Sequence, residues 1–226
     1  MPRHALFLLA LLLAPQLAMA AEPAPVEAKL NEPIPLFDGN PLHGWAVADT
    51  ADFPRHGEVK VHEGTLALGI GGQGTGIRCT KKDLPRTNYE IRLEAMRTEG
   101  RDFFCGLTLP VGESYVSYIV GGWGGGTIGF SNIDGLSADE NATSDYIEFE
   151  EKTWYKIRVR VTDHRLSAWI NGEQKADVAR EGREFGIWWE QEPLRPLGIA
   201  TWNTAARLRN IELVPLPPPA AEEAAD

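Results

Sequence analysis

The chain has 226 residues, of which 43% are hydrophobic, and a formal net charge of −10 at pH 7. A chain of this length and composition buries a sizeable core. Its negative charge disfavours attraction to nucleic acid or to anionic lipid, so we expect no nucleic-acid partner.

The first twenty residues have the pattern of a secretory signal peptide. A basic start, Arg3, precedes an apolar run over residues 5–14, which is too short to span a bilayer as a membrane anchor. The small-residue pattern Ala18-Met19-Ala20 follows, and it predicts cleavage after Ala20. We therefore expect export to the bacterial periplasm or the extracellular space, without membrane insertion after cleavage.

The mature chain is predicted to hold one domain between two tails. Residues 21–33 and 215–226 are rich in Ala, Pro and Glu, as solvated tails are. Between them, short alternating segments recur between clusters of Gly, Asn, Asp and Pro, which is typical of strands joined by turns. Residues 34–214 are accordingly expected to form a single all-β domain, an antiparallel β-sandwich.

Two segments with a period of two predict strands of opposite charge. Residues 89–95 alternate apolar side chains with Glu90, Arg92 and Glu94, and residues 155–161 alternate apolar side chains with three basic ones. Each strand should therefore have one face in solvent. If the two strands pair, exposed acidic and basic side chains would lie opposite each other.

The next segments predict a meander and a closing strand. Asn171-Gly172, which both tolerate positive φ, follows an alternating strand at 165–170 and signals a tight hairpin. Residues 155–161, 165–170 and 173–178 are thus expected to be three neighbouring strands. Residues 208–214 form the last strand, which stops at Pro215.

Seven short motifs occur in a fixed order along the chain, at residues 36–39, 44–45, 61–66, 89–94, 154–157, 168–172 and 208–211. Their order and spacing resemble the 3-keto-disaccharide hydrolase domain family, also described as 3-keto-glucoside lyase and hydratase domains. The resemblance covers roughly residues 34–214 and implies a jelly roll of the concanavalin-like or laminin-G-like type that acts on carbohydrates. The chain departs from the common family pattern at residues 102–110.

Aromatic residues divide into scaffold and candidate substrate-binding groups. Trp45, Trp154 and Trp169 belong to the family motifs and are expected in the core or at a sheet edge. Trp123 stands among five glycines, where its indole would be exposed as a platform for a sugar, or would fold back as a plug. The remaining substrate-binding candidates are Tyr118, Trp188 and Trp189.

Candidate catalytic residues are carboxylates with aromatic or cationic neighbours. Glu190 and Glu192 flank Gln191 directly after the Trp188-Trp189 pair, and aromatic neighbours can raise a carboxyl pKa by excluding water. Glu148 shares a face with Glu150, although that alternation also fits a plain half-buried strand. Arg78 is a candidate donor to the keto oxygen of a 3-keto sugar, with a surface-charge role as the alternative.

No cofactor is predicted, but the loop at 131–141 offers oxygen ligands. Asp134 and Asp139 in this loop are weak candidates for calcium, whereas the same residue types also simply favour turns. Cys79 and Cys105 are the only cysteines, and export would permit a disulfide between them, although a buried free thiol is equally compatible with the apolar run around Cys105.

The expected partner is a carbohydrate, and the oligomeric state stays open. The first hypothesis is an exported enzyme that cleaves the glycosidic bond of 3-keto-glycosides by hydrolysis, or by elimination and hydration. The alternatives are a non-catalytic carbohydrate-binding or adhesion module on the same sandwich, and a structural envelope protein.

Overall fold

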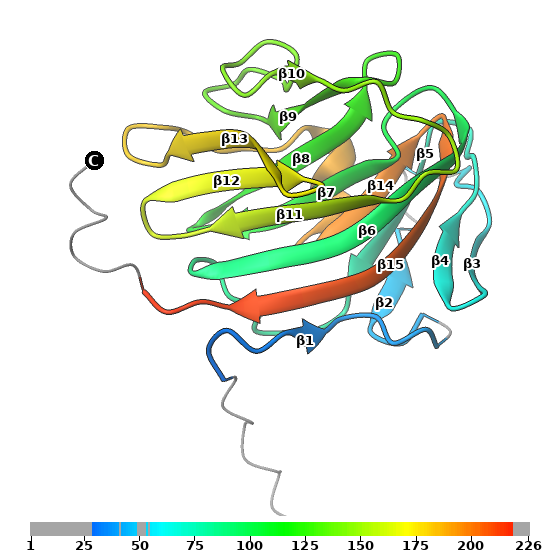
Figure 1. Cartoon of the computed structure of the whole chain (residues 1–226), viewed down its shortest axis with the longest axis horizontal. Helices are drawn as coiled ribbons and strands as arrows, with labels where there is room; N and C mark the ends of the chain where they lie inside the picture. Colours follow the sequence, from blue (N-terminus) through cyan, green and yellow to red (C-terminus); the bar gives the residue numbers. More distant parts are fainter. Residues whose placement is uncertain (1–28, 41, 49–52, 54, 219–226) are drawn as a thin grey trace, which may run out of the picture.

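The computed structural model describes residues 29–40, 42–48, 53 and 55–218, and it contains two antiparallel sheets that face each other (Figure 1). The predicted signal peptide and most of both predicted tails lie outside these described residues. The all-β sandwich expected from the alternating segments is confirmed.

The eight-stranded sheet has its strands in an order that differs from the chain order. Neighbouring strands follow the order β13 (Glu173–Ala179), β12 (Arg165–Ile170), β11 (Tyr155–Val161), β6 (Tyr89–Gly100), β15 (Thr204–Pro215), β4 (Thr65–Leu68) and β3 (Val59–His62). The eighth strand, β1 (Ile34–Pro35), pairs with β15.

The seven-stranded sheet lies behind the first in Figure 1. Its order is β10 (Asp145–Tyr146), β9 (Thr127–Ser131), β8 (Ser114–Gly122), β7 (Cys105–Val111), β14 (Gly198–Trp202), β5 (Gly74–Cys79) and β2 (Trp45–Val47). The short 3₁₀ helix η1 (Trp189–Leu194) packs against β5 and β14.

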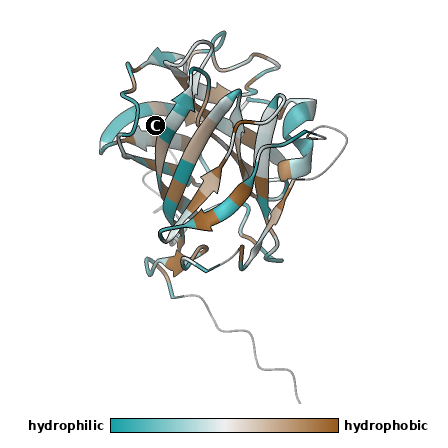
Figure 2. Cartoon of the chain, turned by 90° about the vertical axis from the view of Figure 1, so that its right-hand side faces the viewer, coloured by the Kyte–Doolittle hydropathy of each residue, from teal (hydrophilic) through white to brown (hydrophobic). Residues whose placement is uncertain are grey.

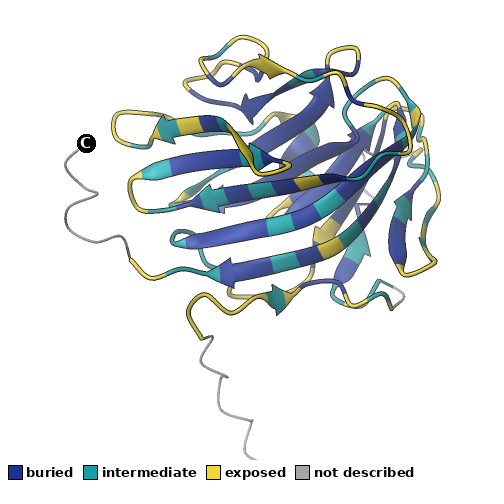
Figure 3. Cartoon of the chain, viewed as in Figure 1, coloured by how far each residue is buried: buried dark blue, intermediate teal, exposed yellow. Residues whose placement is uncertain are grey.

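Alternate side chains of both sheets meet between them and form the core. Apolar and polar residues form bands along the strands in Figure 2, and Figure 3 shows buried stretches on β6 and β12 and an alternation of buried and more exposed residues on β11. From β7 and β8 the core receives Leu107, Leu109, Val116 and Tyr118, which face apolar side chains of the other sheet. The strand period of two therefore accounts for the main core.

The predicted meander is present, and only its third strand, β13, ends one residue later than expected. β11 and β12 coincide with the segments at 155–161 and 165–170, and the hairpin between β12 and β13 has Asn171 at φ 51° and Gly172 at φ 88°. These are the left-handed conformations that this residue pair tolerates. The segment at 89–95 opens the longer β6, and the segment at 208–214 closes β15.

The predicted pairing of charged rows occurs, but one carboxylate is buried instead of exposed. β11 lies beside β6, so that Arg160 is opposite Glu90 and Arg158 is opposite Arg92. The side chain of Glu90 has an exposed fraction of 0%. Its oxygens accept hydrogen bonds from Arg92 Nε at 2.8 Å and from Arg160 Nε at 2.7 Å, and Arg158 Nη1 lies at 3.5 Å. Three long guanidinium side chains cover the carboxylate, which a pattern of alternation does not reveal.

The three tryptophans expected to belong to the scaffold each have a contact within the chain. The Arg158 guanidinium lies 3.8 Å from the centre of the Trp169 ring, and that of Arg209 lies 4.0 Å from the Trp154 ring. Trp45 is buried and donates its indole N–H to the Leu36 carbonyl at 2.9 Å. Trp154 and Trp169 therefore each have a ring face occupied by an arginine, as cation–π pairs.

Both cysteines are buried free thiols, so the possible disulfide is absent. Burial raises the pKa of Cys105 to about 12 and also raises the pKa of Cys79. Neither thiol is thus activated as a nucleophile.

None of the helices in the described part of the chain is long and apolar enough to cross a membrane.

Glu90→Gln is expected to destabilise the domain, because the change leaves three arginines close together without their shared carboxylate. Removing one partner of a fully buried pair costs about 3 to 5 kcal/mol, and the partial exposure of these arginines should reduce the loss to about 2 kcal/mol. Urea unfolding at low and high NaCl measures this loss in the free energy of unfolding. The loss should become smaller at high NaCl, because salt screens the repulsion between the arginines.

The matched control is Glu63→Gln, which removes a carboxylate that binds Arg207 at 3.0 Å at the surface. It should change the free energy of unfolding much less. Equal effects of the two substitutions, or a Glu90 deficit that does not depend on salt, would contradict the assignment of Glu90 as the centre of this network.

Candidate functional site in a groove on the seven-stranded sheet

One row on the outer face of the seven-stranded sheet carries glycine or alanine at every position but one. Residues directly opposite each other on paired strands share a face, and large apolar side chains such as Leu107, Tyr118 and Ile199 face the core on the other side. Following the register from β9 to β5, this row consists of Gly129, Ile119, Gly106, Ala200 and Gly76.

Side chains from outside the sheet pack directly onto this row. A Cβ on Gly76 would lie 2.7 Å from Leu194 of η1, and one on Gly106 would lie 3.0 Å from the Phe103 ring. Leu194 and Ala200 belong to a second, small core, against which Phe103 packs. The glycines thus allow η1 and Phe103 to approach the sheet surface.

The segment 183–188, named the strap here, leads into η1 and runs beside the loop that follows β9. Two backbone hydrogen bonds join Asn132 and Gly186, at 2.7 Å and 3.1 Å. The Gln191 N–H donates to the Trp188 carbonyl at 2.9 Å and starts the helical turn. The strap and η1 therefore fix the position of Trp188 above the sheet.

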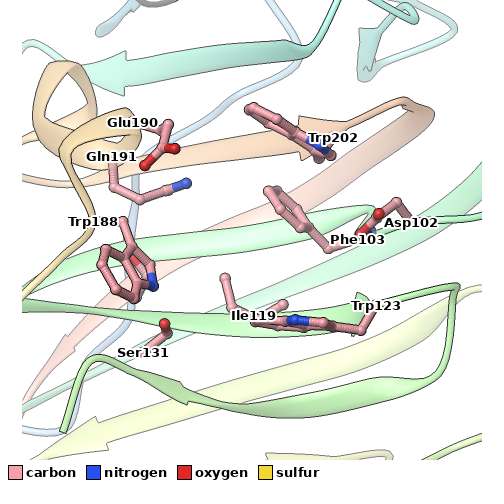
Figure 4. Close-up of a pocket in the computed structure, with 10 residues that line it drawn as sticks. Asp102, Phe103, Ile119, Trp123, Ser131, Trp188, Glu190, Gln191 and Trp202 are labelled. Atoms are coloured by element: carbon pink, nitrogen blue, oxygen red, sulfur yellow. Dashed lines mark hydrogen bonds between the residues drawn. The ribbon is translucent and has the colours of Figure 1, made fainter. Parts of the chain in front are cut away.

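A line of polar groups connects η1 to the sheet. The hydroxyls of Ser117 and Thr108 lie 2.8 Å apart, and Thr108 Oγ1 donates to Oε1 of the buried Gln191 at 3.3 Å. Since its oxygen faces Thr108, the Gln191 amide presents its nitrogen on the other side. Figure 4 shows this nitrogen pointing into the space between the flanking aromatic side chains.

These features enclose a groove of about 300 Å³ on the outer face of the sheet. One side comes from the strap and η1, the other from the β6–β7 connection and the end of β14 (Figure 4). Its lining consists of Asp102, Phe103, Ser117, Ile119, Trp123, Ser131, Trp188, Glu190, Gln191 and Trp202.

Three tryptophans give the groove aromatic walls. Trp123 and Trp188 are 48% and 45% exposed, and Trp202 stacks on Phe103 with their ring centres 6.3 Å apart. Trp123 lies in the glycine-rich turn at residues 121–126, named the Trp123 turn here, with φ at 46°. None of the three has an arginine over its ring among the described residues, in contrast to Trp154 and Trp169.

Two carboxyl groups lie at different ends of the groove (Figure 4). Asp102 accepts a hydrogen bond from the Phe103 N–H at 2.7 Å and another from the Trp123 N–H. Burial raises the pKa of Asp102 despite these two bonds, which lower it. Glu190 forms no hydrogen bond or ion pair through its carboxylate within the described ranges, so it is available to a ligand.

The structure brings only some of the predicted site residues together. Trp123, Trp188 and Glu190 line one groove although they are far apart in the sequence. Trp189 is 62% exposed and lies outside the lining.

The other candidates lie elsewhere. Tyr118 is in the core, with its ring 4.8 Å from that of Phe130, because it faces inward together with Val116. Glu148 is exposed beside the buried Phe149; the alternation of burial is as expected, although the strand itself ends at Tyr146. Arg78 is exposed and borders a separate hollow.

The two candidate calcium ligands have protein partners. Asp134 accepts hydrogen bonds from the Glu184 N–H at 2.9 Å and from Arg183 at 2.6 Å, and these two contacts lower its pKa. Asp139 accepts one from the Ser137 hydroxyl at 2.6 Å. Among the described residues, no group of three or more His, Cys, Asp or Glu side chains is arranged to hold a metal. Calcium binding stays a prediction.

Asp102, Gln191 and Trp202 line the groove although none of them was predicted as a site residue. Asp102 precedes the Phe103-Phe104 pair, and this combination of acid and aromatics resembles the one at residues 188–190. Gln191 lies between Glu190 and Glu192, but the sequence pattern does not indicate that its amide faces a groove, and Trp202 carries no comparable signal. Gln191 reaches the groove because η1 packs against β5 and β14, and Trp202 reaches it because β14 lies between β5 and β7.

Solved structures with a similar fold include a glycosyl hydrolase and a domain of an arabinanase. A provisionally assigned glycosyl hydrolase from Parabacteroides distasonis is 16% identical, with 80% of this chain and 93% of that chain covered and a TM-score of 0.51. Domain 4 of an extracellular arabinanase from Geobacillus stearothermophilus, determined with arabinotriose, is 13% identical, with 84% and 94% covered and a TM-score of 0.51. At these identities the likeness shows a shared fold.

No protein with a curated description matches the sequence. One family model, described as the 3-keto-alpha-glucoside-1,2-lyase-like domain, matches residues 32–214, which includes the whole span 34–214 for which a family resemblance was expected. On the strength of this match, the chain belongs to the 3-keto-alpha-glucoside-1,2-lyase-like domain family.

Proposed function

We propose that the chain binds a saccharide in the groove and cleaves the glycosidic bond of a 3-keto-glycoside, by hydrolysis or by elimination followed by hydration. The observation that carries this proposal is the convergence of Trp123, Trp188 and Trp202 with two carboxyl groups on one face of the sandwich. Aromatic faces pack on the apolar C–H faces of a sugar ring, while the carboxyl groups supply proton transfer.

The chemistry of a 3-keto sugar assigns a role to each polar group. The keto group acidifies the neighbouring C–H, and a donor on the keto oxygen stabilises the negative charge that develops there. The inward-facing Gln191 amide is the proposed donor, and the neighbouring Glu190 carboxylate is the proposed base. Asp102, whose pKa is raised by burial, is the proposed acid.

In the elimination, each proton and electron pair has a destination. Glu190 takes the proton from the carbon beside the keto group, and the electron pair left behind forms a double bond to the next carbon. That carbon loses its bond to the glycosidic oxygen, which takes a proton from Asp102. Addition of water across the double bond then restores a 3-keto sugar.

The ligand expected in this groove is a neutral sugar. The lining contains two carboxyl groups and no lysine, arginine or histidine, so a uronic acid or a sulfated sugar would meet unbalanced negative charge. The predicted signal peptide would place the activity in the periplasm or outside the cell.

A non-catalytic carbohydrate-binding module is the second candidate, and the open rim of the groove favours it. Trp123 and Trp188 are each about half exposed, as the side chains of a binding platform would be. The similar arabinanase domain was determined with arabinotriose, which supports saccharide binding on this type of sandwich. Binding without turnover would favour this candidate.

Trp123→Ala and Trp188→Ala are each expected to weaken saccharide binding about tenfold or more, because each removes an aromatic wall. Isothermal titration of the mature chain with a 3-keto-glucoside and its reduced glucoside measures the affinities. Trp189→Ala is the matched control, since this exposed tryptophan lies outside the lining. Equal losses in all three variants would argue against this groove as the binding site.

Glu190→Gln and Asp102→Asn are each expected to lower kcat about 10² to 10⁴-fold while leaving the dissociation constant within a small factor, because each removes proton transfer and keeps the side-chain shape. Release of free sugar from a 3-keto-glucoside gives the rates. Glu148→Gln, which changes an exposed carboxylate outside the groove, should be as active as the original chain. Undiminished turnover in both groove variants would exclude the assigned roles.

The pH dependence of kcat/KM should follow the protonation state of Asp102. An acid acts in its protonated form, so kcat/KM should fall as pH rises through the Asp102 pKa, at a pH above the 3.8 of an ordinary aspartate. Measurement of kcat/KM across the acidic and neutral range tests this. A profile in which kcat/KM only rises over that range would assign Asp102 the role of a base instead.

A further inference from the structure

Arg97 is a buried arginine that joins three segments of the chain behind the groove. It lies on β6 with an exposed fraction of 7%. Its Nη1 donates to the Gly125 carbonyl at 3.0 Å, and its Nη2 donates to the Phe149 carbonyl at 2.7 Å. One guanidinium thus connects the eight-stranded sheet, the Trp123 turn and the segment that follows β10.

This arrangement leaves a positive charge without a carboxylate partner. Arg97 takes part in no salt bridge with the described residues, and its Nε is buried there without an acceptor. The guanidinium carbon lies 5.7 Å from the centre of the Phe104 ring, so a π face provides part of the missing compensation. Burial of an unpaired cation is costly, and an apolar side chain at this position would avoid that cost. The cost suggests that the two carbonyl contacts have a function of their own.

Those contacts hold a turn whose conformation is unfavourable in isolation. Trp123 has φ at 46°, in the left-handed region that a bulky residue rarely occupies. The Gly125 N–H donates to the Gly122 carbonyl at 3.1 Å, and the Ile147 N–H donates to the Gly126 carbonyl at 3.0 Å. Asp102 accepts from the Trp123 N–H on the groove side.

The guanidinium approaches the turn closely. A Cβ on Gly125 would lie 2.8 Å from Nη1 of Arg97, so the side chain occupies the space that any residue other than glycine would need at this position. The glycine and the arginine therefore fit each other, and Asp102 and Arg97 hold the Trp123 turn from its two sides.

We infer that Arg97 is a positioning residue that fixes the Trp123 wall of the groove through the Gly125 carbonyl. The inference rests on the proposed function for the role of Trp123 in binding sugar, but the effect on the turn itself does not depend on any ligand. A guanidinium suits this task because its fork presents separate N–H groups to two carbonyls, whereas an ammonium is a single point charge.

The first test measures the turn without ligand. In Arg97→Ala, amide hydrogen exchange at residues 122–127 should accelerate about tenfold or more, because a charge-assisted anchor of the turn is lost. Arg209→Ala is the matched control, since Arg209 is also a partly buried arginine on the eight-stranded sheet but does not contact the turn. Its exchange at residues 122–127 should be unchanged.

The second test restores the missing group. Guanidinium chloride at a low, non-denaturing concentration should slow exchange at the turn in Arg97→Ala, and sodium chloride at the same ionic strength should not. If Arg97→Ala does not fold, Arg97→Lys takes its place, with intermediate exchange expected because the ammonium binds only one carbonyl. Exchange at the turn that is no faster than in the original chain, in either variant, would overturn the inference.

Saccharide binding separates this inference from the proposed function. The dissociation constant for a 3-keto-glucoside should rise about tenfold in Arg97→Ala and recover with guanidinium. If the original chain binds no saccharide while the exchange results are as expected, the proposed function fails and the role of Arg97 stands. If saccharide binds equally well to both proteins, Arg97 does not position a binding wall.

Discussion

The site depends on one constraint, which is that three neighbouring positions on the outer face of the seven-stranded sheet carry glycine or alanine. These residues, Gly76, Gly106 and Ala200, lie side by side on β5, β7 and β14, and Leu194 and Phe103 pack directly onto them. A larger side chain at any of these three positions would displace η1 or Phe103 from the sheet. The small residues between the two sides of the groove therefore set the distance between them. One side carries Trp188, Glu190 and Gln191, and the other carries Trp202.

The two outer faces of the sandwich serve opposite purposes. On the eight-stranded sheet, arginines cover the buried Glu90 and lie over Trp154 and Trp169, so the face is closed by contacts within the chain. On the seven-stranded sheet, Trp123 and Trp188 remain about half exposed, and Glu190 has no partner in the described structure. The same residue types, tryptophan and charged side chains, thus stabilise one face and form a groove on the other.

Alternation in the sequence predicted β11, β12 and the hairpin at Asn171 with their boundaries, because a strand with one apolar face has a local signature. The same alternation places Tyr118 on the inward face together with Val116, so the burial of Tyr118 could have been predicted from the sequence. The burial of Glu90 and the composition of the groove could not be obtained in this way. They depend on which strands become neighbours: Trp202 and Asp102 meet only after β14 inserts between β5 and β7, and the local pattern of a segment does not encode that order.

The central claim is that a 3-keto sugar binds between the aromatic walls of this groove, with its keto oxygen at the Gln191 amide. A crystal structure of the Glu190→Gln variant with a bound 3-keto-glucoside tests this most directly. The account predicts a sugar ring between Trp123, Trp188 and Trp202, with the keto oxygen within hydrogen-bonding distance of Gln191 Nε2. A sugar bound on the arginine-covered face, or in the groove with its keto group turned away from Gln191, would contradict it.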